Sequence, residues 1–477
     1  MKKTIFILSF IIAGLIPAFS QQTLIYGNNK TYAGETIKLY RYNDLICKQK
    51  EEIGSISFDK NGDFSSYLNI NNTEYIFAYF GIYKFEFYAE KGKDYKLIFP
   101  DKKEKTTADR LNPYFKYKIA QLGIANEPPN GLNAAIREFD KFYDYYIELN
   151  FNKIVNGVDS KLDSFIIGLK KHFGVVENKY FKDYMRYKIY YLDFLSYHKD
   201  YKYITQYFFK NQEILYNNTA YMELFNNLYF NFVFTYPATK KGRGFYESIA
   251  LAKSPYAINE VMSREVVFSD KRLNNLIILK SLHDAFVADV PFNYKKYPKK
   301  SLIITLDSMQ YYANNEFEQK IIKDIKKKFI ENPMARNKPL PDAVVLDTDS
   351  NEVHLSSVGG KGKFTLISFT MTNCVPCQKD LEILKVYSEK YSHDLKIVTV
   401  IVNQDFLTMR NFLKKHEDYK WQFFHYFGNK EILNTYNIQS IPKYILLDPY
   451  GQMVMPSAPP PGESFIVAFR KIRQNMR

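Results

Sequence analysis

The sequence predicts a multidomain chain with an N-terminal β-sandwich, a central α-helical region and a C-terminal α/β fold. Short alternating apolar and polar runs fill residues 21–104, and apolar residues at helical spacing fill residues 105–330. Strand-like runs then alternate with helix-like runs in residues 342–477. Residues 331–341 (ENPMARNKPLP) carry three prolines, and proline prevents a helix from continuing. We therefore predict three domains, with a linker at residues 331–341.

The first twenty residues have the features of a secretory signal peptide. Lys2 and Lys3 precede an apolar run from Ile5 to Ile16, and Ala18-Phe19-Ser20 then places small residues before Gln21. The apolar run is shorter than the roughly 20 residues that a membrane span needs. No later stretch is apolar enough to span a membrane. We therefore expect cleavage after residue 20, no stable membrane insertion, and a protein located in the periplasm or exported. An uncleaved N-terminal anchor is the alternative.

Composition argues against several classes of partner. The formal net charge is +15, but lysine is spread over every segment and no arginine-rich stripe or nucleic-acid motif occurs. We therefore expect a solvated basic surface and no nucleic acid. The 41 Tyr and 39 Phe are best explained as a bias of the whole sequence, with a Tyr-rich sugar-binding surface as the alternative. No two of the 7 His stand at metal-ligand spacing, so we expect no metal and no cofactor.

The β-sandwich is predicted from a series of short strands. Thr36–Tyr42 alternates apolar and polar residues, and Asp59-Lys60-Asn61-Gly62 separates two further runs, Gly54–Phe58 and Phe64–Ile70. Asn-Gly between two such runs is a strong hairpin signal, because both residues tolerate a positive φ. Cys47 lies in or beside this region, and we interpret it as an inert, half-buried thiol.

The central region, residues 105–330, has helical patterns but no chemical motif. The clearest helix follows the capping residues Asp159-Ser160 and ends at Gly174. The basic loop Lys240–Gly244 lacks the spacing of a phosphate loop, and a flexible loop is the better interpretation.

Two of the 3 Cys stand close together, as Cys374-Val375-Pro376-Cys377. They follow an apolar run, Lys363–Thr370, that reads as a buried strand, and they precede a helix-like run to about Tyr391. A CxxC pair between a strand and a helix indicates redox reactivity rather than a structural staple.

The position of each cysteine predicts its role. Cys374 stands at the helix N-terminus, where unpaired N–H groups and the helix dipole favour a thiolate, so it is the expected nucleophile. Its pKa is expected to fall from about 8.5 into the range of about 3.5–7.5, and the polar Asn373 beside it is expected to leave it exposed to water. Cys377, one turn further along, is expected to be buried and to resolve the mixed disulfide. A third element is Ile441-Pro442, directly before a strand, where a cis bond is expected.

These residues resemble the TlpA-like branch of the thioredoxin superfamily. The resemblance covers about residues 338–477 and rests on PLPDAVVLD, on Gly362-Lys363, on CVPC and on YNIQSIPKYILLDPYG. It implies a C-terminal α/β thioredoxin-like fold in which Cys374 attacks, Cys377 resolves and Pro442 is the cis-proline that positions the substrate. Family members reduce or exchange disulfides in the bacterial envelope. The N-terminal β-sandwich looks like the small β domain that precedes such modules in Bacteroidetes proteins.

Two positions depart from the family pattern. The family usually has Trp immediately before the nucleophile, where this chain has Asn373. Ser368 occupies the strand position that holds a buried acid in thioredoxin. That acid assists proton transfer to the resolving cysteine, so the rate or direction of exchange is open. Asp380 and Glu382 follow on the helix, and we assign them no role from the sequence.

Two classes of function remain. The leading hypothesis is an enzyme, a periplasmic thiol–disulfide oxidoreductase in cell redox homeostasis. Its partners would be protein dithiol or disulfide clients and a thiol protein of the envelope that donates electrons. The alternative is a non-enzymatic envelope binding protein with a degenerate thioredoxin-like domain. A peroxiredoxin is disfavoured, because Met371 stands where that class needs Thr. The sequence determines neither the direction of electron flow nor the client.

Overall fold

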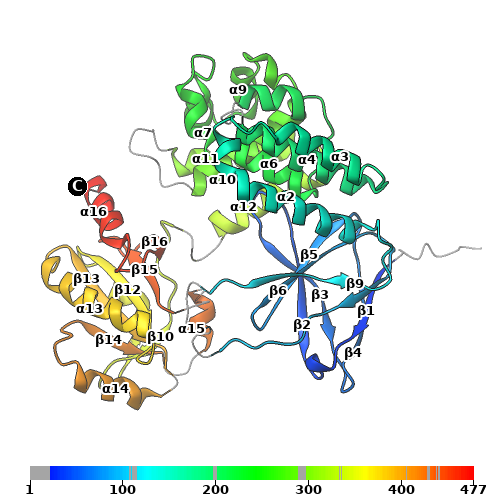
Figure 1. Ribbon diagram of the computed structural model, residues 1–477. Helices are drawn as coiled ribbons and strands as arrows, with labels where there is room; N and C mark the ends of the chain where they lie inside the picture. The colour runs from blue at the N-terminus through cyan, green and yellow to red at the C-terminus, as the bar shows by residue number, and fades with distance from the viewer. Residues whose placement is uncertain are drawn as a thin grey trace, which may run out of the picture.

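The computed structural model describes residues 22–106, 109, 115–196, 201–287, 297–331, 334, 336–403, 405–426, 430–436, 438 and 441–476. The predicted signal peptide, residues 1–20, lies outside them. Three groups of elements follow one another along the chain: a β-rich group, a helical group and an α/β group (Figure 1). The helical group lies against the β-rich group, and the α/β group lies to one side of both (Figure 1).

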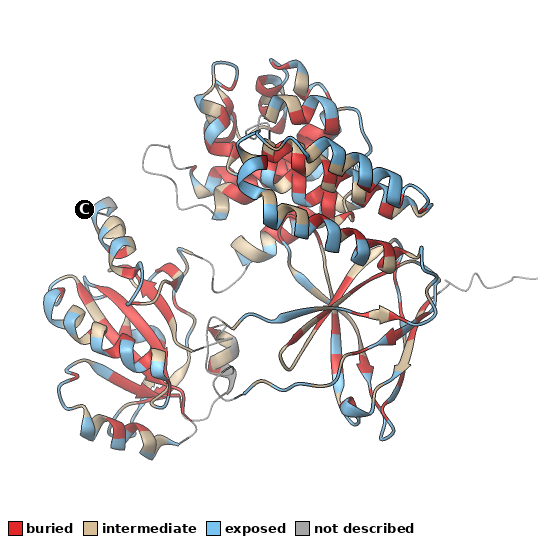
Figure 2. Ribbon diagram, in the orientation of Figure 1, coloured by how far each residue is buried: buried red, intermediate tan, exposed pale blue. Residues whose placement is uncertain are grey.

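The β-rich group contains two sheets that share one hydrophobic core. One sheet has the order β4-β1-β7-β9 and the other has the order β3-β2-β5-β6-β8. Side chains of both sheets, such as Ile25 and Leu97 of the first and Ile37 and Ile76 of the second, belong to one buried cluster. Buried positions recur along the strands of this β-rich group (Figure 2). The strands are β1 Thr23–Asn28, β2 Thr36–Tyr42, β3 Lys50–Ser57, β4 Asp63–Leu68, β5 Glu74–Phe80, β6 Tyr83–Ala89, β7 Tyr95–Ile98, β8 Lys118–Gln121 and β9 Gly123–Ile124.

The predicted hairpin around Asn61-Gly62 is wrong. The turn itself forms, with Asp59 N donating to the Asp63 carbonyl at 2.9 Å, but β3 pairs with β2 and β4 pairs with β1. Gly62 has a φ of +82°, and a Cβ there would lie 2.6 Å from the backbone of Asn29, directly after β1. The turn therefore packs against the end of β1 and carries the chain from one sheet to the other.

The boundary predicted at residue 105 also differs from the structure. β8 pairs in parallel with β6, and β9 pairs antiparallel with β7, so residues 118–124 belong to the two sheets. The first long helix begins only at Leu132. The two strands have four and two residues, too few to show an alternating pattern in the sequence.

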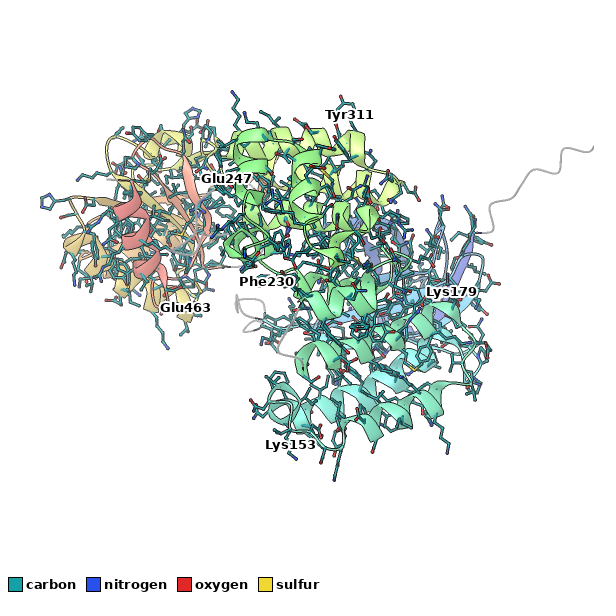
Figure 3. All side chains as sticks on the ribbon, turned by 90° about the horizontal axis from the view of Figure 1, so that it is seen from above. Lys153, Lys179, Phe230, Glu247, Tyr311 and Glu463 are labelled. Atoms are coloured by element: carbon teal, nitrogen blue, oxygen red, sulfur yellow. A yellow bond between two sulfur atoms is a disulfide. The ribbon has the colours of Figure 1, made fainter. Side chains whose placement is uncertain are left out.

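The helical group buries many aromatic side chains. The fully buried ones include Phe139, Phe181 and Tyr221, whereas Phe230 and Tyr311 are exposed at its surface (Figure 3). The helices are α2 Leu132–Val155, α3 Leu162–Phe173, α4 Lys179–Ser196, α5 Tyr201–Ile204, α6 Thr219–Leu228, α7 Phe232–Thr235, α8 Phe245–Glu247, α9 Pro255–Met262, α10 Lys271–Val287, α11 Lys299–Tyr312 and α12 Glu316–Lys326. Across the described residues, no helix combines the length and the apolar character that crossing a bilayer requires.

The loop between β2 and β3, residues 43–49, inserts into the helical group. Ile46 and Cys47 are buried in the helical core rather than in the core of the two sheets. Asn226 of α6 donates to the Leu45 carbonyl at 2.8 Å, and Lys328 donates to the Cys47 carbonyl at 3.1 Å. The β-rich and helical groups are therefore joined by a shared apolar core as well as by hydrogen bonds.

The α/β group is built on one sheet with the order β11-β10-β14-β13-β12-β15-β16. The strands β12, β13 and β14 are parallel, β15 pairs antiparallel with β12, and β16 pairs antiparallel with β15 at the edge of the sheet. The elements are β10 Val344–Leu346, β11 Glu352–His354, β12 Phe364–Thr370, α13 Val375–Lys390, β13 Leu395–Ile401, α14 Phe406–Lys415, β14 Gln422–His425, α15 Lys430–Thr435, β15 Lys443–Leu447, β16 Met453–Ala458 and α16 Phe465–Asn475. All seven residues of β12 are buried, as expected for a central strand with both faces covered.

Candidate active site

The two neighbouring cysteines stand where β12 passes into α13. The loop of residues 371–374 leaves the carboxyl end of β12, and Val375 begins the helix. Pro376 lies in the first turn of α13, where its missing N–H is not needed. The order of strand, loop and helix therefore presents the CxxC segment at one end of the sheet.

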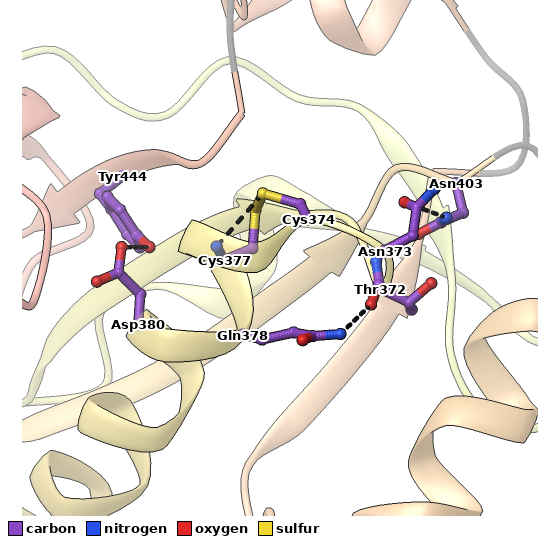
Figure 4. The surroundings of a disulfide bond; sticks show 8 residues. All are labelled: Thr372, Asn373, Cys374, Cys377, Gln378, Asp380, Asn403 and Tyr444. Carbon is purple, nitrogen blue, oxygen red and sulfur yellow. Dashed lines mark hydrogen bonds between the residues drawn. A yellow bond between two sulfur atoms is a disulfide. The ribbon is translucent and has the colours of Figure 1, made fainter. Parts of the chain in front are cut away.

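Cys374 and Cys377 form a disulfide, with their Cα atoms 5.2 Å apart. Cys374 is the N-cap residue of α13, with extended backbone angles, and its Sγ accepts a hydrogen bond from the Cys377 N–H at 3.3 Å (Figure 4). A sulfur in this position faces the unpaired N–H groups of the first helical turn. The helix start therefore offers stabilisation to negative charge on Cys374.

The expected exposure of Cys374 is wrong for this oxidised form. Cys374 is 0% exposed and Cys377 is 1% exposed, whereas the intervening Val375 is 64% exposed. The reason is geometric: Sγ of Cys374 turns inward to bond Cys377 and to accept its N–H. Attack on another molecule requires this sulfur to turn outward after reduction.

The Ile441-Pro442 peptide bond is cis, which confirms the geometry predicted for it. Lys443, the next residue, pairs with Phe369 near the carboxyl end of β12. Pro442 therefore lies at the end of the sheet from which the loop of residues 371–374 departs. The pairing register of β12 and β15 thus brings Pro442 to the same end of the sheet as the loop of residues 371–374, although the two are 68 or more residues apart in the chain.

Asp380 is a buried carboxyl group near the disulfide, and sequence reasoning assigned it no role. It lies three residues after Cys377, so both side chains share one face of α13. Its carboxylate accepts from Tyr444 Oη of β15 at 2.7 Å (Figure 4), and it also accepts from Gly462 N at 3.3 Å. Burial raises the pKa of Asp380, and these two hydrogen bonds offset part of that rise. The signal available in the sequence was the i, i+3 spacing between Cys377 and an acid on the inner face.

Ser368, which occupies the strand position of the buried acid in thioredoxin, lies in the middle of β12. It is 1% exposed, and its Oγ has no hydrogen-bond partner among the described residues. In the sheet it stands beside Tyr444 of β15, whose hydroxyl is bonded to Asp380. A carboxyl group of α13 is thus linked, through the hydroxyl of Tyr444, to the strand next to Ser368.

The loop of residues 371–374 is held on both sides of Thr372. The Thr372 N–H donates to Oδ1 of Asn403 at 2.9 Å, and the Thr372 carbonyl accepts from Gln378 Nε2 at 2.6 Å. Nδ2 of Asn403 also donates to Oδ1 of Asn373 at 3.4 Å. Asn403 itself is 9% exposed, and its carbonyl accepts from Nε2 of His425 at 2.8 Å. The side chains of Asn403, after β13, and of Gln378, on α13, therefore hold the loop of residues 371–374 (Figure 4).

A family model described as thioredoxin-like matches residues 362–453, which include both cysteines and Pro442. This part of the chain is a thioredoxin-like domain. The curated relatives that match the chain are named thiol-disulfide oxidoreductase ResA. The protein from Bacillus cereus is 29% identical over 122 residues, which is 25% of this chain and 68% of that protein. The protein from Bacillus subtilis is 29% identical over 116 residues, 24% of this chain and 62% of that protein.

Two of the solved structures that are similar to the thioredoxin-like domain come from Bacteroides. The thioredoxin domain of a thiol-disulfide oxidoreductase from Bacteroides vulgatus is 22% identical, with a TM-score of 0.25, over 28% of this chain and 96% of that chain. A thiol-disulfide oxidoreductase from Bacteroides fragilis is 19% identical, with a TM-score of 0.26, over 28% of this chain and 99% of that chain. These similarities extend over little more than a quarter of this chain.

Proposed function

We propose that this protein is an exported thiol–disulfide oxidoreductase that exchanges or reduces disulfides of envelope proteins through Cys374 and Cys377. The observation that carries the proposal is the Cys374–Cys377 disulfide at the N-terminus of α13. The thioredoxin-like match and the oxidoreductase names of the curated relatives support the same chemistry.

The proposed reaction transfers two electrons from the reduced pair to a client disulfide. The Cys374 thiolate attacks one client sulfur, a mixed disulfide forms, and the other client sulfur leaves as a thiolate. The Cys377 thiol then loses its proton and attacks Sγ of Cys374, which releases the second client thiolate and leaves the Cys374–Cys377 disulfide. A thiol protein of the envelope would return the pair to its reduced form, and the reverse sequence would oxidise a client.

Three neighbouring groups have proposed roles in these steps. Pro442, directly before β15 and at the same end of the sheet as the loop of residues 371–374, positions the extended client segment. The N–H groups at the start of α13 stabilise the Cys374 thiolate. Asp380 accepts the proton that Cys377 must lose, because a buried carboxyl group with a raised pKa is matched to that transfer.

The proposal includes a division of the chain into three domains after a signal peptide. We infer a β-sandwich domain that includes β8 and β9, a helical domain from Leu132 to about residue 331, and the thioredoxin-like domain after the linker. Residues 1–20 act as the signal peptide. Intact-mass measurement of the protein recovered from the periplasm tests this, and retention of residues 1–20 would contradict it.

The experiment that tests the function is reduction of insulin disulfides by the full-length mature protein with dithiothreitol as electron source. We expect the wild type to accelerate insulin reduction over dithiothreitol alone. Replacing Cys377 by Ala should then trap clients as mixed disulfides on Cys374, while the matched variant Cys47→Ala traps none. No acceleration and no trapped species would favour the binding-protein alternative instead.

A further inference from the structure

We propose that Asn403 is a positioning residue, which fixes the loop of residues 371–374 and so keeps the sulfur of Cys374 at the first turn of α13. The inference deepens the proposed function and rests on it. Asn403 touches neither sulfur, so its effect acts through the loop.

The first part of the argument is the place of Asn403 in the fold. It lies two residues beyond the end of β13, the strand paired in parallel with β12. Val402 N donates to the Thr370 carbonyl at 2.9 Å, which extends the pairing to the last residue of β12. Asn403 therefore stands directly beside the point where the chain leaves the sheet for the cysteine loop.

The second part is how Asn403 divides its hydrogen bonds. Its side-chain oxygen accepts the Thr372 N–H, and its side-chain nitrogen donates to the Asn373 side chain. A side-chain amide offers this acceptor and this donor on two separate atoms. The two loop residues held in this way are the ones immediately before Cys374.

The backbone of Asn403 is itself held by a hydrogen bond from the neighbouring strand β14. Its carbonyl accepts from the ring of His425, which is 1% exposed on β14. The cysteine loop is therefore connected through Asn403 to the buried end of a neighbouring strand. A support built on two strands moves less than one built on the loop alone.

The third part is the consequence for the sulfur. Cys374 N donates to the Met371 carbonyl at 3.3 Å, closing a turn over residues 371–374, and Thr372 lies inside that turn. When the disulfide is reduced, the S–S bond no longer holds Cys374 against Cys377. The turn then has to keep Cys374 as the cap of α13, where the helix N–H groups stabilise its thiolate. Asn403 maintains that turn in both redox states.

The test compares Asn403→Ala with Asn226→Ala in the reduced full-length protein. Asn226 is a matched control, because its side chain also holds a backbone group of another loop, the Leu45 carbonyl, which is far in the chain from Cys374 and Cys377. The rate of iodoacetamide labelling of Cys374 is followed against pH. We expect the midpoint to rise by about one pH unit in Asn403→Ala, a roughly tenfold loss of thiolate near pH 6, and not to move in Asn226→Ala.

The other titratable groups on the elements around the loop are unchanged in both variants. They include Lys379, Asp380 and Glu382 on α13, Asp405 before α14, His425 on β14 and Lys443 on β15. Insulin reduction by Asn403→Ala is expected to slow by about the same tenfold as the thiolate population. Amide hydrogen exchange at Thr372 should accelerate in Asn403→Ala and remain slow in Asn403→Asp, which keeps the acceptor.

Two results would overturn the inference. One is an unchanged midpoint and rate in Asn403→Ala, and the other is an equal shift in Asn226→Ala, which would reveal a general loss of stability. Failure of the proposed function is a separate result, because the wild type itself would then fail to reduce insulin.

Discussion

The loop of residues 43–49 and the loop of residues 371–374 both carry a buried cysteine, and they place it in opposite surroundings. Cys47 lies in the helical core, with its Sγ 4.0 Å from the Ile321 carbonyl. Burial, and then the charge of Asp44, raise the pKa of Cys47 well above that of an ordinary thiol. Cys374 instead faces N–H groups at a helix start. The comparison teaches that reactivity follows from the neighbouring dipoles and charges, since burial alone is common to both.

The difference between the two cysteines is tested most directly by removing one sulfur at a time. We expect Cys374→Ser to lower insulin reduction by at least about a hundredfold, because the nucleophile is lost. Cys47→Ala should keep the wild-type rate, because no step uses that thiol. Equal losses in both variants, measured in the same assay, would show that the distinction between the two loops is false.

The same comparison can be made within the wild-type protein. Each pKa unit changes the thiolate population about tenfold near neutral pH, so Cys374 should react at least about a hundredfold faster than Cys47 in the reduced protein. Brief iodoacetamide treatment near pH 6, followed by peptide mass mapping, gives the ratio. Labelling of Cys47 ahead of Cys374 would remove the main physical support for the oxidoreductase proposal.

Asp380 adds a second difference between the two sites, because it is a buried acid near Cys374 and Cys377. We expect Asp380→Asn to slow release of the client from the mixed disulfide by about tenfold or more, since the proton acceptor for Cys377 is lost. In the wild type this release should accelerate as the pH rises through the raised pKa of Asp380, and the variant should lack that rise. Stopped-flow kinetics with a model mixed disulfide measure both, and Glu382→Gln serves as the control on the same helix. A wild-type pH profile in Asp380→Asn would exclude the proposed role.

Asp44 offers the corresponding test in the other loop. Burial, and then a hydrogen bond with the Asp324 carboxyl group, raise the pKa of Asp44 from 3.8 to about 7. The folded protein therefore binds this proton more tightly than the unfolded chain, and stability falls as the pH rises from about 4 through 7. Asn in place of Asp44 keeps the acceptor for Ile46 N and Cys47 N and can donate to Asp324 at every pH.

We expect the stability advantage of Asp44→Asn over the wild type to be larger at pH 8 than at pH 5 by about 2–3 kcal/mol, because about two pH units separate pH 5 from the raised pKa of Asp44. Urea unfolding at the two pH values measures the difference. A constant difference between pH 5 and pH 8 would mean that Asp44 does not carry the proton.

Local signals in the sequence predicted the parts of the site that depend on neighbours in the chain. The CxxC segment at a helix start and the Ile441-Pro442 bond before a strand are such features, and the structure has both. Asn403 and Tyr444 escaped prediction because their roles depend on strand register. The role of Asp380 was not predicted because it depends on burial of the carboxyl group against Tyr444 of β15, and the position of Asp380 in the helix sequence does not indicate that contact.

The same limit explains the errors in the β-rich region. The turn at Asn61-Gly62 was recognised, but which strands pair is decided by contacts remote in sequence, and β3 and β4 joined different sheets. The short strand β14, Gln422–His425, was not predicted at all, although it supports the cysteine loop through His425. The positions of most longer strands were therefore readable from the sequence, whereas the short strands and the pairing between strands were not.

The insertion of residues 43–49 has a consequence for how the chain comes apart. Since Ile46 and Cys47 belong to the helical core, the two sheets cannot separate from the helices without exposing apolar surface, at a cost of about 1.5–3 kcal/mol for each large side chain. The buried clusters of the thioredoxin-like domain contain only residues from Met334 onward. Heating should therefore unfold the chain in two calorimetric transitions rather than three. The β-rich and helical groups together should unfold as one cooperative unit, and the thioredoxin-like domain should unfold as the other.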